Sequence, residues 1–407
     1  MANKPKIRFK GFDDAWEQRK LGDLVGIYDG VHQTPEYQDS GIMFLSVENI
    51  ATLKSEKYIS KEAFERDYKV YPEKGDILMT RIGDVGTTNV VETAKKVAFY
   101  VSLALLKPNG INSYFLSNAM KTNAFQKGLR ERTLVTAIPQ KINKDEIGKI
   151  DIFITNNDVE QQKIGAYFST LDHLITLHQR KCDQMKELKK YMLTKMFPQN
   201  GAKVPEIRFD GFIDDWEQRK LGDVVERVTR KNQDLVSQLP LTISAQYGLI
   251  DQNMFFDKRV ASKDVSGYYL IYNGEFAYNK STSSDAPWGA IKRLDRYENG
   301  VLSTLYIVFK IKNEKVINSD FLVTYYDTCN WHKDIKAVAA EGARNHGLLN
   351  IAPADFFKTE LMLPQDIEEQ KKIGSYFKLI DHLITLHQSK CENLKNLKEY
   401  LLRNMFV

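Results

Sequence analysis

The sequence predicts an α+β fold made twice, with two globular α/β domains separated by two long helices that pair as an antiparallel coiled coil. Three observations predict it. The chain has 407 residues, too many for one ordinary core. Two blocks of sequence recur about 200 residues apart, which gives a pseudo-two-fold internal repeat. The regions between these blocks mix strand and helix patterns, as expected of an α+β domain.

The repeat is clearest at the two ends of each half. Residues 5–25 and 205–225 agree at 16 of 21 positions, and residues 160–197 and 369–406 agree at 24 of 38. The residues between these blocks barely align, and the second half is nine residues longer. Drift alone should change both parts alike, so this pattern indicates a shared frame that carries two different specificities.

The second repeated block has the heptad pattern of a long helix with one apolar stripe. Asn157 with Glu160, and Asp366 with Glu369, have the spacing of a capping box that starts a helix. At 1.5 Å per residue a 38-residue helix is about 57 Å long and needs a partner, for which its own duplicate is the obvious choice. The stripe is predicted at Ile164, Phe168, Leu171, Ile175, His178, Cys182, Ile373, Phe377, Ile380, Ile384, His387 and Cys391.

His178 and His387 stand at the midpoints of the two copies. In an antiparallel pair they should meet near the centre, where a polar residue that fixes the register is favoured over a metal site or a pH switch. The predicted domains are a first recognition domain at 1–157, the first long helix at 158–199, a second recognition domain at 200–366 and the second long helix at 367–407.

Strand patterns in the variable regions are bounded by Gly, Pro and Asn. They lie at Ile42–Leu45, Gly75–Thr80, Val97–Leu106, Lys149–Ile154, Leu241–Ser244, Gly274–Asn279, Val301–Ile311 and Thr359–Leu363. Two helices are predicted between them, at Ile111–Lys127 and Ser319–Trp331.

Composition and charge narrow the function. The net charge of +5 favours polyanionic partners only weakly, and residues 26–159 hold 17 basic and 17 acidic side chains, so a nucleic-acid surface must come from patches. Three cysteines without a Cys-x-x-Cys pair argue against a disulfide framework and a zinc site. No apolar run is long enough to cross a bilayer and no secretion signal precedes the first block, so a cytoplasmic protein without membrane contact is expected.

Catalytic motifs are not recognisable. The sequence has no phosphate-binding Gly-x-x-x-x-Gly-Lys-[Ser/Thr] loop, no His-Glu-x-x-His, no Gly-x-Ser-x-Gly and no adjacent prolines of the kind found in many adenine methyltransferases. The cluster from Gly83 to Gly86 lacks the lysine of a phosphate loop and is better interpreted as a tight turn. We therefore expect a binding protein rather than an enzyme.

Polar and basic loop residues in the variable regions are the candidates for contacts with DNA. Arg and Lys can bind guanine edges, Asn and Gln adenine edges, and the remaining charges can hold phosphates. The candidates are Thr34, Arg81, Thr87, Arg130, Arg132 and Lys141 in the first half, and Arg230, Lys231, Gln246, Lys280, Arg344, Asn345 and His346 in the second. Lys280 stands where Arg81 would in the other copy.

These blocks resemble those of the specificity subunits of Type I restriction–modification enzymes. The resemblance rests on Arg-Phe-x-Gly-Phe…Trp-Glu-Gln-Arg-Lys-Leu-Gly-Asp at 8–23 and 208–223, with Glu-Gln-x-Lys-Ile-Gly-x-Tyr-Phe…Asp-His-Leu-Ile at 160–175 and 369–384. It extends over the whole chain. One departure is that Ile154-Thr155 stands where the second copy has Leu363-Pro364, which leaves the first helix boundary less sharply set.

The resemblance implies that each variable region reads one half of a bipartite, asymmetric sequence in double-stranded DNA. The helices would act as a spacer and dock two modification (methyltransferase) subunits, which restriction (translocase and nuclease) subunits would join. This chain would bind no cofactor and no metal; S-adenosylmethionine, ATP and Mg²⁺ would bind to the partner subunits, in a system of DNA methylation and bacterial defence.

Two other interpretations remain open. A coiled-coil scaffold without DNA contact would explain the helices, but not two divergent domains with basic loops; DNA binding that strengthens as salt falls would separate it from the recognition subunit. An enzyme with an unfamiliar site, such as a nuclease, would show metal-dependent activity that a single carboxylate substitution abolishes.

Overall fold

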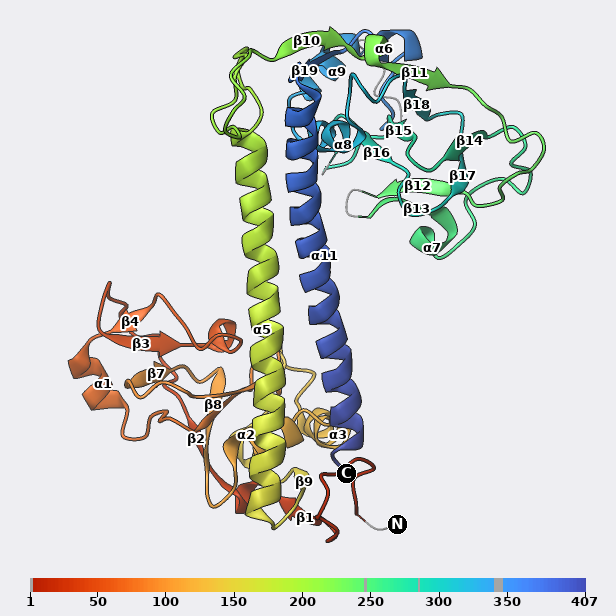
Figure 1. Ribbon diagram of the computed structural model, residues 1–407. Coiled ribbons are helices and arrows are strands. Elements are labelled where there is room, and N and C mark those ends of the chain that lie inside the picture. Colours follow the sequence, from red (N-terminus) through yellow and green to blue (C-terminus); the bar gives the residue numbers. More distant parts are fainter. Residues whose placement is uncertain (1–2, 245–246, 285, 340–346) are drawn as a thin grey trace. The chain divides into compact units, whose positions relative to one another are not determined.

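The computed structural model describes residues 3–244, 247–284, 286–339 and 347–407. The chain divides into two compact units: unit 1 consists of Met1–Arg180 with His387–Val407, and unit 2 of Lys181–Leu386. Each unit contains one α/β domain and a part of each of the two long helices (Figure 1). None of the described helices is long and apolar enough to cross a membrane.

Unit 1 is built on a four-stranded antiparallel sheet in the order β2-β8-β5-β6. A three-stranded sheet in the order β4-β3-β7 and the antiparallel pair β1-β9 complete its strands. The strands are β1 (Glu17–Lys20), β2 (Val25–Asp29), β3 (Ile42–Leu45), β4 (Tyr58–Ile59), β5 (Ile77–Thr80), β6 (Thr88–Val90), β7 (Val97–Phe99), β8 (Leu103–Pro108) and β9 (Asp151–Ile154). Its short helices are α1 (Lys61–Asp67), α2 (Ser113–Ala119), α3 (Asn123–Arg132) and α4 (Lys144–Gly148), with 3-10 turns at Leu21–Asp23 and Val47–Asn49.

Unit 2 repeats the four-stranded sheet in the same order, as β11-β18-β15-β16, and repeats the β1-β9 pair as β10-β19. The second sheet of unit 1 is replaced by two separate antiparallel pairs, β12-β13 and β14-β17. The strands are β10 (Glu217–Lys220), β11 (Val225–Val228), β12 (Leu241–Ser244), β13 (Gly248–Asp251), β14 (Tyr269–Tyr272), β15 (Phe276–Asn279), β16 (Ala290–Arg293), β17 (Asn299–Leu302), β18 (Ile307–Ile311) and β19 (Glu360–Leu363). The short helices are α6 (Leu221–Val224), α7 (Gln252–Phe256), α8 (Ser319–Asp327), α9 (His332–Val338) and α10 (Pro353–Phe356).

The long helices are α5 (Asp158–Lys195) and α11 (Ile367–Asn404), and they pack together in antiparallel fashion. In unit 1, Asp172 of α5 binds Lys398 of α11, while His178 lies beside His387. In unit 2, Lys189 binds Asp381. The partner's number falls as the number along α5 rises, which defines the antiparallel direction.

The apolar stripe of each helix serves two purposes. Ile164, Phe168 and Leu171 belong to the core of unit 1 together with Trp16 and residues from the end of α11. Ile373, Phe377 and Ile380 do the same in unit 2, with Phe197 at the end of α5. The predicted stripe residues Cys182 and Cys391 are buried, whereas Ile175, His178, Ile384 and His387 are half-buried. Most of the stability of such helices comes from this burial.

Each long helix starts at the predicted cap. The side chain of Asn157 accepts the backbone N–H of Glu160 at 3.1 Å, and Asp366 accepts that of Glu368 at 2.8 Å. The capping box predicted that the glutamate side chains would bind back to the cap residues. The structure instead gives these glutamates arginine partners. Glu160 and Glu369 are fully buried, and each binds an arginine of the first repeated block, Arg8 or Arg208. The buried carboxylate takes this partner because an arginine compensates its charge fully.

Four predicted elements are wrong in their continuity or their length. Val97–Leu106 is two strands, because the turn after Phe99 moves the chain from the sheet of β3 to that of β5. Val301–Ile311 is divided in the same way between the β14 pair and the β15 sheet. The predicted helix Ile111–Lys127 breaks into α2 and α3, where the Thr122 side chain caps α3, and Ser319–Trp331 ends with α8. An apolar run does not reveal which partner strand each residue will meet.

Candidate nucleic-acid interface

In unit 1 a junction of two loops contains several of the candidate residues. One loop is the turn that follows β5, residues 81–87, and the other is residues 133–141, between α3 and α4. Gly83 N–H donates to the carbonyl of Gln140 at 2.9 Å, and the Gln140 side chain donates back to the Gly83 carbonyl at 3.0 Å. Ile142 N–H donates to the carbonyl of Arg81 at 3.0 Å. These bonds fix the two loops against each other.

The turn is held against α3 by a glycine. Gly86 has a φ of +105°, and a Cβ there would lie 2.2 Å from a Leu129 methyl group. The Gln126 side chain donates to the Gly86 carbonyl at 3.4 Å. A larger residue would therefore push the turn away from the helix, which explains the glycine without a phosphate-binding role.

Arg81 is buried, and its guanidinium is bound to Asp29 at the end of β2. Burial lowers the pKa of Arg81 from its ordinary value. The Nε atom of Arg81 is buried without a hydrogen-bond partner in the described structure. Arg81 therefore links β2 to the start of the turn, and any contact with DNA remains a prediction.

The other first-half candidates are more accessible. Thr34, Thr87, Arg130 and Lys141 are exposed, and Arg132 is half-buried, with Nη1 donating to the Gly128 carbonyl at 3.2 Å. Thr87 donates to Asp84 at 2.7 Å within the turn. Lys141 forms β-bridges with both Ile82 and Leu134, so it lies in the junction itself. Arg130 and Arg132 end the helix that leads into the second loop, whereas Thr34 lies in the separate loop after β2.

Unit 2 has the same junction. Thr282 N–H donates to the carbonyl of Gly347 at 2.6 Å, and Leu349 N–H donates to the carbonyl of Lys280 at 3.0 Å. Lys280 follows β15 as Arg81 follows β5, as the repeat predicted. Its ammonium donates to the Ile351 carbonyl at 3.3 Å, and burial, followed by the charge of Arg227, lowers the pKa of Lys280. Arg227 is exposed and was not among the candidates.

Arg230 and Lys231 lie at β14 instead. Arg230 binds Glu275 through both terminal nitrogens, at 3.3 and 3.1 Å, and its guanidinium lies 4.6 Å from the centre of the Tyr272 ring. Lys231 lies 4.2 Å from the Tyr269 ring and donates to the Gly267 carbonyl at 2.8 Å. Gln246, Arg344, Asn345 and His346 lie outside the described residues.

An apolar feature of the unit 1 junction was not predicted from the sequence. Val135 is 70% exposed and Ile138 is 100% exposed, in the middle of the loop that carries Lys141. A sign was present in the sequence, since apolar residues stand there between a helix and a buried isoleucine without a strand or helix period. Only the structure shows that they face solvent.

The predicted meeting of the histidines is confirmed. The Nδ1 atoms of His178 and His387 lie 2.9 Å apart, and the ring centres are 5.1 Å apart. Nearby, the Cys391 thiol donates to the Ile175 carbonyl at 3.9 Å and to the Gln179 side chain at 3.6 Å. Within the described residues no group of three or more His, Cys, Asp or Glu side chains could hold a metal ion.

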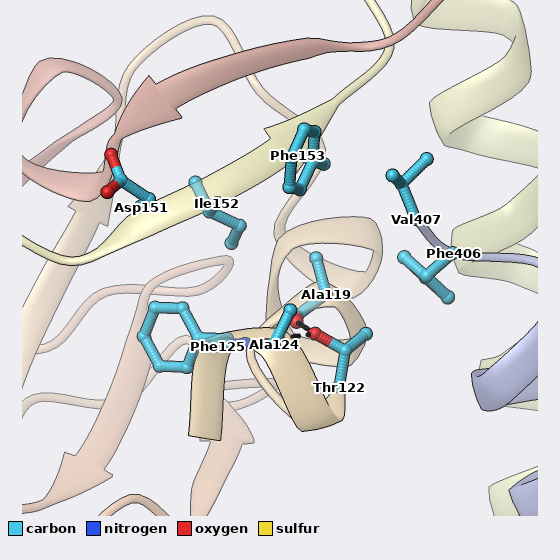
Figure 2. A pocket seen from close by; sticks show the side chains of 9 residues that line it. All are labelled: Ala119, Thr122, Ala124, Phe125, Asp151, Ile152, Phe153, Phe406 and Val407. Carbon is cyan, nitrogen blue, oxygen red and sulfur yellow. Dashed lines mark hydrogen bonds between the residues drawn. The ribbon is translucent and has the colours of Figure 1, made fainter. Parts of the chain in front are cut away.

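Figure 2 shows a small pocket in unit 1 between the α2–α3 corner, β9 and the end of the chain. Phe153 and Phe406 line it, and Thr122 donates to the Ala119 carbonyl at 2.8 Å beside it. Its volume of about 10 Å³ has room for a single water molecule at most. It is therefore a packing defect, and no small-molecule site is assigned to it.

Comparison with known proteins connects this repeated architecture to one family. The model of the Type I restriction modification DNA specificity domain matches residues 13–187 and again residues 213–396. The search of curated proteins found no match.

Three solved structures are similar along nearly their whole length. The S subunit of a Type I restriction-modification system from M. genitalium has a TM-score of 0.67 and 14% identity, with 99% of each chain covered. The HsdS subunit of Thermoanaerobacter tengcongensis gives 0.41 and 14%, with 96% of each chain covered. A structure described as showing complex assembly and conformational transition of the type I R-M system gives 0.45 and 13%, with 96% of this chain and 98% of that chain covered. With one family match in each repeat and the M. genitalium fold shared from end to end, the chain belongs to the Type I restriction modification DNA specificity family, as a non-catalytic recognition subunit with two target recognition domains.

Proposed function

We propose that each of the two domains reads one half of a bipartite, asymmetric sequence in double-stranded DNA. One observation supports this most: the four-stranded sheet, the long helices and the loop junction are repeated, while the second sheet and the loop sequences differ. A conserved frame with different loops is what two different half-sites require, because bases are read by the side chains presented to their edges.

The loop junction is the surface that we assign to DNA in each unit. In unit 1 it carries Lys141 and adjoins Arg130 and Arg132, and in unit 2 it carries Lys280 with Arg227 nearby. Arg130, Lys141 and Arg227 of this group are exposed, and exposed cations can hold phosphates and place neighbouring side chains at the bases. Arg230 and Lys231 form a second basic group in unit 2, beside β14.

The partners follow from the family. We propose that the paired helices dock two modification subunits, which bind S-adenosylmethionine and methylate adenine, in the cytoplasm. Restriction subunits that use ATP and Mg²⁺ would join this core. Exposed apolar residues on the helices, such as Leu177, Tyr191, Leu379 and Tyr400, support a protein contact there.

A methylated-adenine map of cells that express this chain with its cognate modification subunit tests the proposal. Cells that lack only this chain are the control. We expect one new bipartite motif with a fixed gap, and replacing residues 226–368 should change only one of its halves. A complex that assembles but produces no motif would instead favour the scaffold without DNA contact. That scaffold also predicts no rise in DNA affinity as salt is lowered.

A further inference from the structure

The loop of residues 133–141 in unit 1 is fixed by hydrogen bonds at both ends, and the part between them carries exposed apolar side chains. Leu134 and Lys141 exchange backbone hydrogen bonds of 2.8 and 3.4 Å, and the Ala137 N–H donates to the Leu134 carbonyl at 3.3 Å. The Thr133 hydroxyl donates to the Leu129 carbonyl at 2.8 Å, which fastens the loop to α3. With the bonds between Gln140 and Gly83, both ends of the loop are fixed.

Three apolar side chains of this loop face solvent. Leu134 is 45% exposed, Val135 70% and Ile138 100%. A single exposed apolar residue is ordinary, but three within five residues of a fixed loop form a patch, and such patches mark binding surfaces. Burying apolar side chains of this size is favourable, so the isolated domain leaves a binding contribution unused.

The charges around the patch indicate a polyanion. The segment from Leu129 to Lys141 contains three basic residues, Arg130, Arg132 and Lys141, and one acidic residue, Glu131. Arg130 and Lys141 are exposed. An apolar tip with cations at its base complements duplex DNA, whose phosphates flank an apolar stack of bases.

We propose that Val135 and Ile138 insert into duplex DNA at the half-site bound by unit 1 and pack against bases at an opened step. This inference rests on the proposed function. An enzyme that modifies a base in duplex DNA must first take that base out of the stack, which opens a step beside it. The opened step exposes apolar base faces to the groove. Apolar side chains that fill such a step stabilise it against closing, as wedge residues do elsewhere.

Unit 2 offers a contrast in its amino-acid sequence before Gly347. Residues 340–346, which precede Gly347 and lie outside the described residues, have the sequence Ala-Glu-Gly-Ala-Arg-Asn-His, without a large aliphatic residue. The apolar insertion is therefore assigned to the half-site of unit 1 alone. The half-site of unit 2 serves as an internal reference within the same DNA molecule.

The test uses the complete complex of this chain with its modification subunits, on DNA that carries the mapped motif. Val135→Ala with Ile138→Ala removes the apolar tip, and Ile213→Ala, at a residue that is 87% exposed in unit 2, is the matched control. Methylation rates are measured separately at the two half-sites. Fluorescence of 2-aminopurine, placed at the target adenine of the first half-site, reports base opening.

We expect the double variant to lower methylation at the first half-site about 10-fold, which corresponds to about 1.4 kcal/mol, and to reduce the 2-aminopurine signal. Methylation at the second half-site and assembly with the modification subunits should be unchanged, as should both half-sites in the Ile213→Ala control. Equal rates at both half-sites, or weaker assembly measured without DNA, would overturn the proposal, the latter by making the loop a protein contact. A wild-type complex that methylates neither half-site would refute the proposed function instead.

Discussion

The two units differ most sharply in the charges that their domains place beside the long helices. In unit 2, Lys189 binds both Asp381 and Asp327, and Lys292 binds the other oxygen of Asp327, all at 2.7 Å. Two lysines therefore face two aspartates. Burial raises the pKa of Asp327, but the charges of Lys292 and Lys189 outweigh this effect and hold that pKa below its ordinary value.

Unit 1 repeats the helix pair but reverses the charge of the domain residue. Lys398 binds Asp172. In the repeat, Lys398 corresponds to Lys189 and Asp172 corresponds to Asp381. Where unit 2 has Asp327, nine residues after the capping Asn318, unit 1 has Lys121, nine residues after Asn112. Two lysines then share one aspartate, and burial, together with the charge of Lys398, lowers the pKa of Lys121 to about 8. The two units thus keep the same frame with opposite charges at one position, Asp327 in unit 2 and Lys121 in unit 1. The lysine is expected to lower the stability of unit 1.

Asp327→Lys should have the largest effect, because it gives unit 2 the charge found in unit 1 and leaves Lys189 and Lys292 without this acid. Removing one partner of a buried ion pair costs about 3–5 kcal/mol. Urea unfolding followed by hydrogen exchange should show the loss in α8 and α9, while α2 and α3 keep their protection. Asp210→Lys, at an exposed site, is the control and should change stability by less than about 0.5 kcal/mol. An equal loss of stability in Asp327→Lys and Asp210→Lys would show that the charge at position 327 does not matter for the stability of unit 2.

Glu160→Gln and Glu369→Gln should show where the units are alike. Each change takes the charge from a buried carboxylate that binds Arg8 or Arg208. A loss of about 3 kcal/mol is expected in the unit concerned. The loss should be somewhat larger for Glu369, which also accepts the Trp216 indole N–H at 3.3 Å, whereas the Trp16 indole nitrogen has no partner in the described structure. Denaturant midpoints of the two variants give the comparison. A loss of stability in only one of the two variants would contradict the shared frame.

Lys121→Met should stabilise unit 1 by about 1–2 kcal/mol at pH 7, because it removes a buried charge that the helix pair does not compensate. The folded pKa of Lys121, about 8, lies below its ordinary value of 10.5, so the unfolded chain binds the proton more tightly. Stability of the original chain should therefore rise from about pH 8 to pH 10.5, and this rise should be absent from the variant. Thermal unfolding across this range measures it, and parallel pH profiles would show that Lys121 is already compensated.

The double change His178→Leu and His387→Leu should have the smallest effect. Replacing the polar pair at the centre of the helices should stabilise their packing by about 1 kcal/mol and loosen their register. A crystal structure of the variant reports the register, and thermal unfolding reports the stability. An unchanged register would show that Asp172–Lys398 and Lys189–Asp381 suffice to fix it.

How far the sequence predicts the candidate site varies with the residue. The equivalence of Arg81 and Lys280 follows from the repeat alone, and both do lie at the start of the same turn. The burial of Arg81 against Asp29 could not be foreseen, because the two residues are 52 positions apart and only the order of strands brings them together. The exposure of Ile138 was equally hidden, since composition cannot tell a solvent-facing loop from a core segment.

The sequence by itself determined the duplication, the length and pairing of the helices, the caps that start them and the family. These features depend on local periods and on identity between the two copies, which are visible without any long-range contact. Only the tertiary structure decided that Val97–Leu106 divides between two sheets, that Glu160 binds Arg8, and that Lys121 faces another lysine. Each of these depends on which distant residue becomes a neighbour, and that is settled by how the sheets and helices pack together.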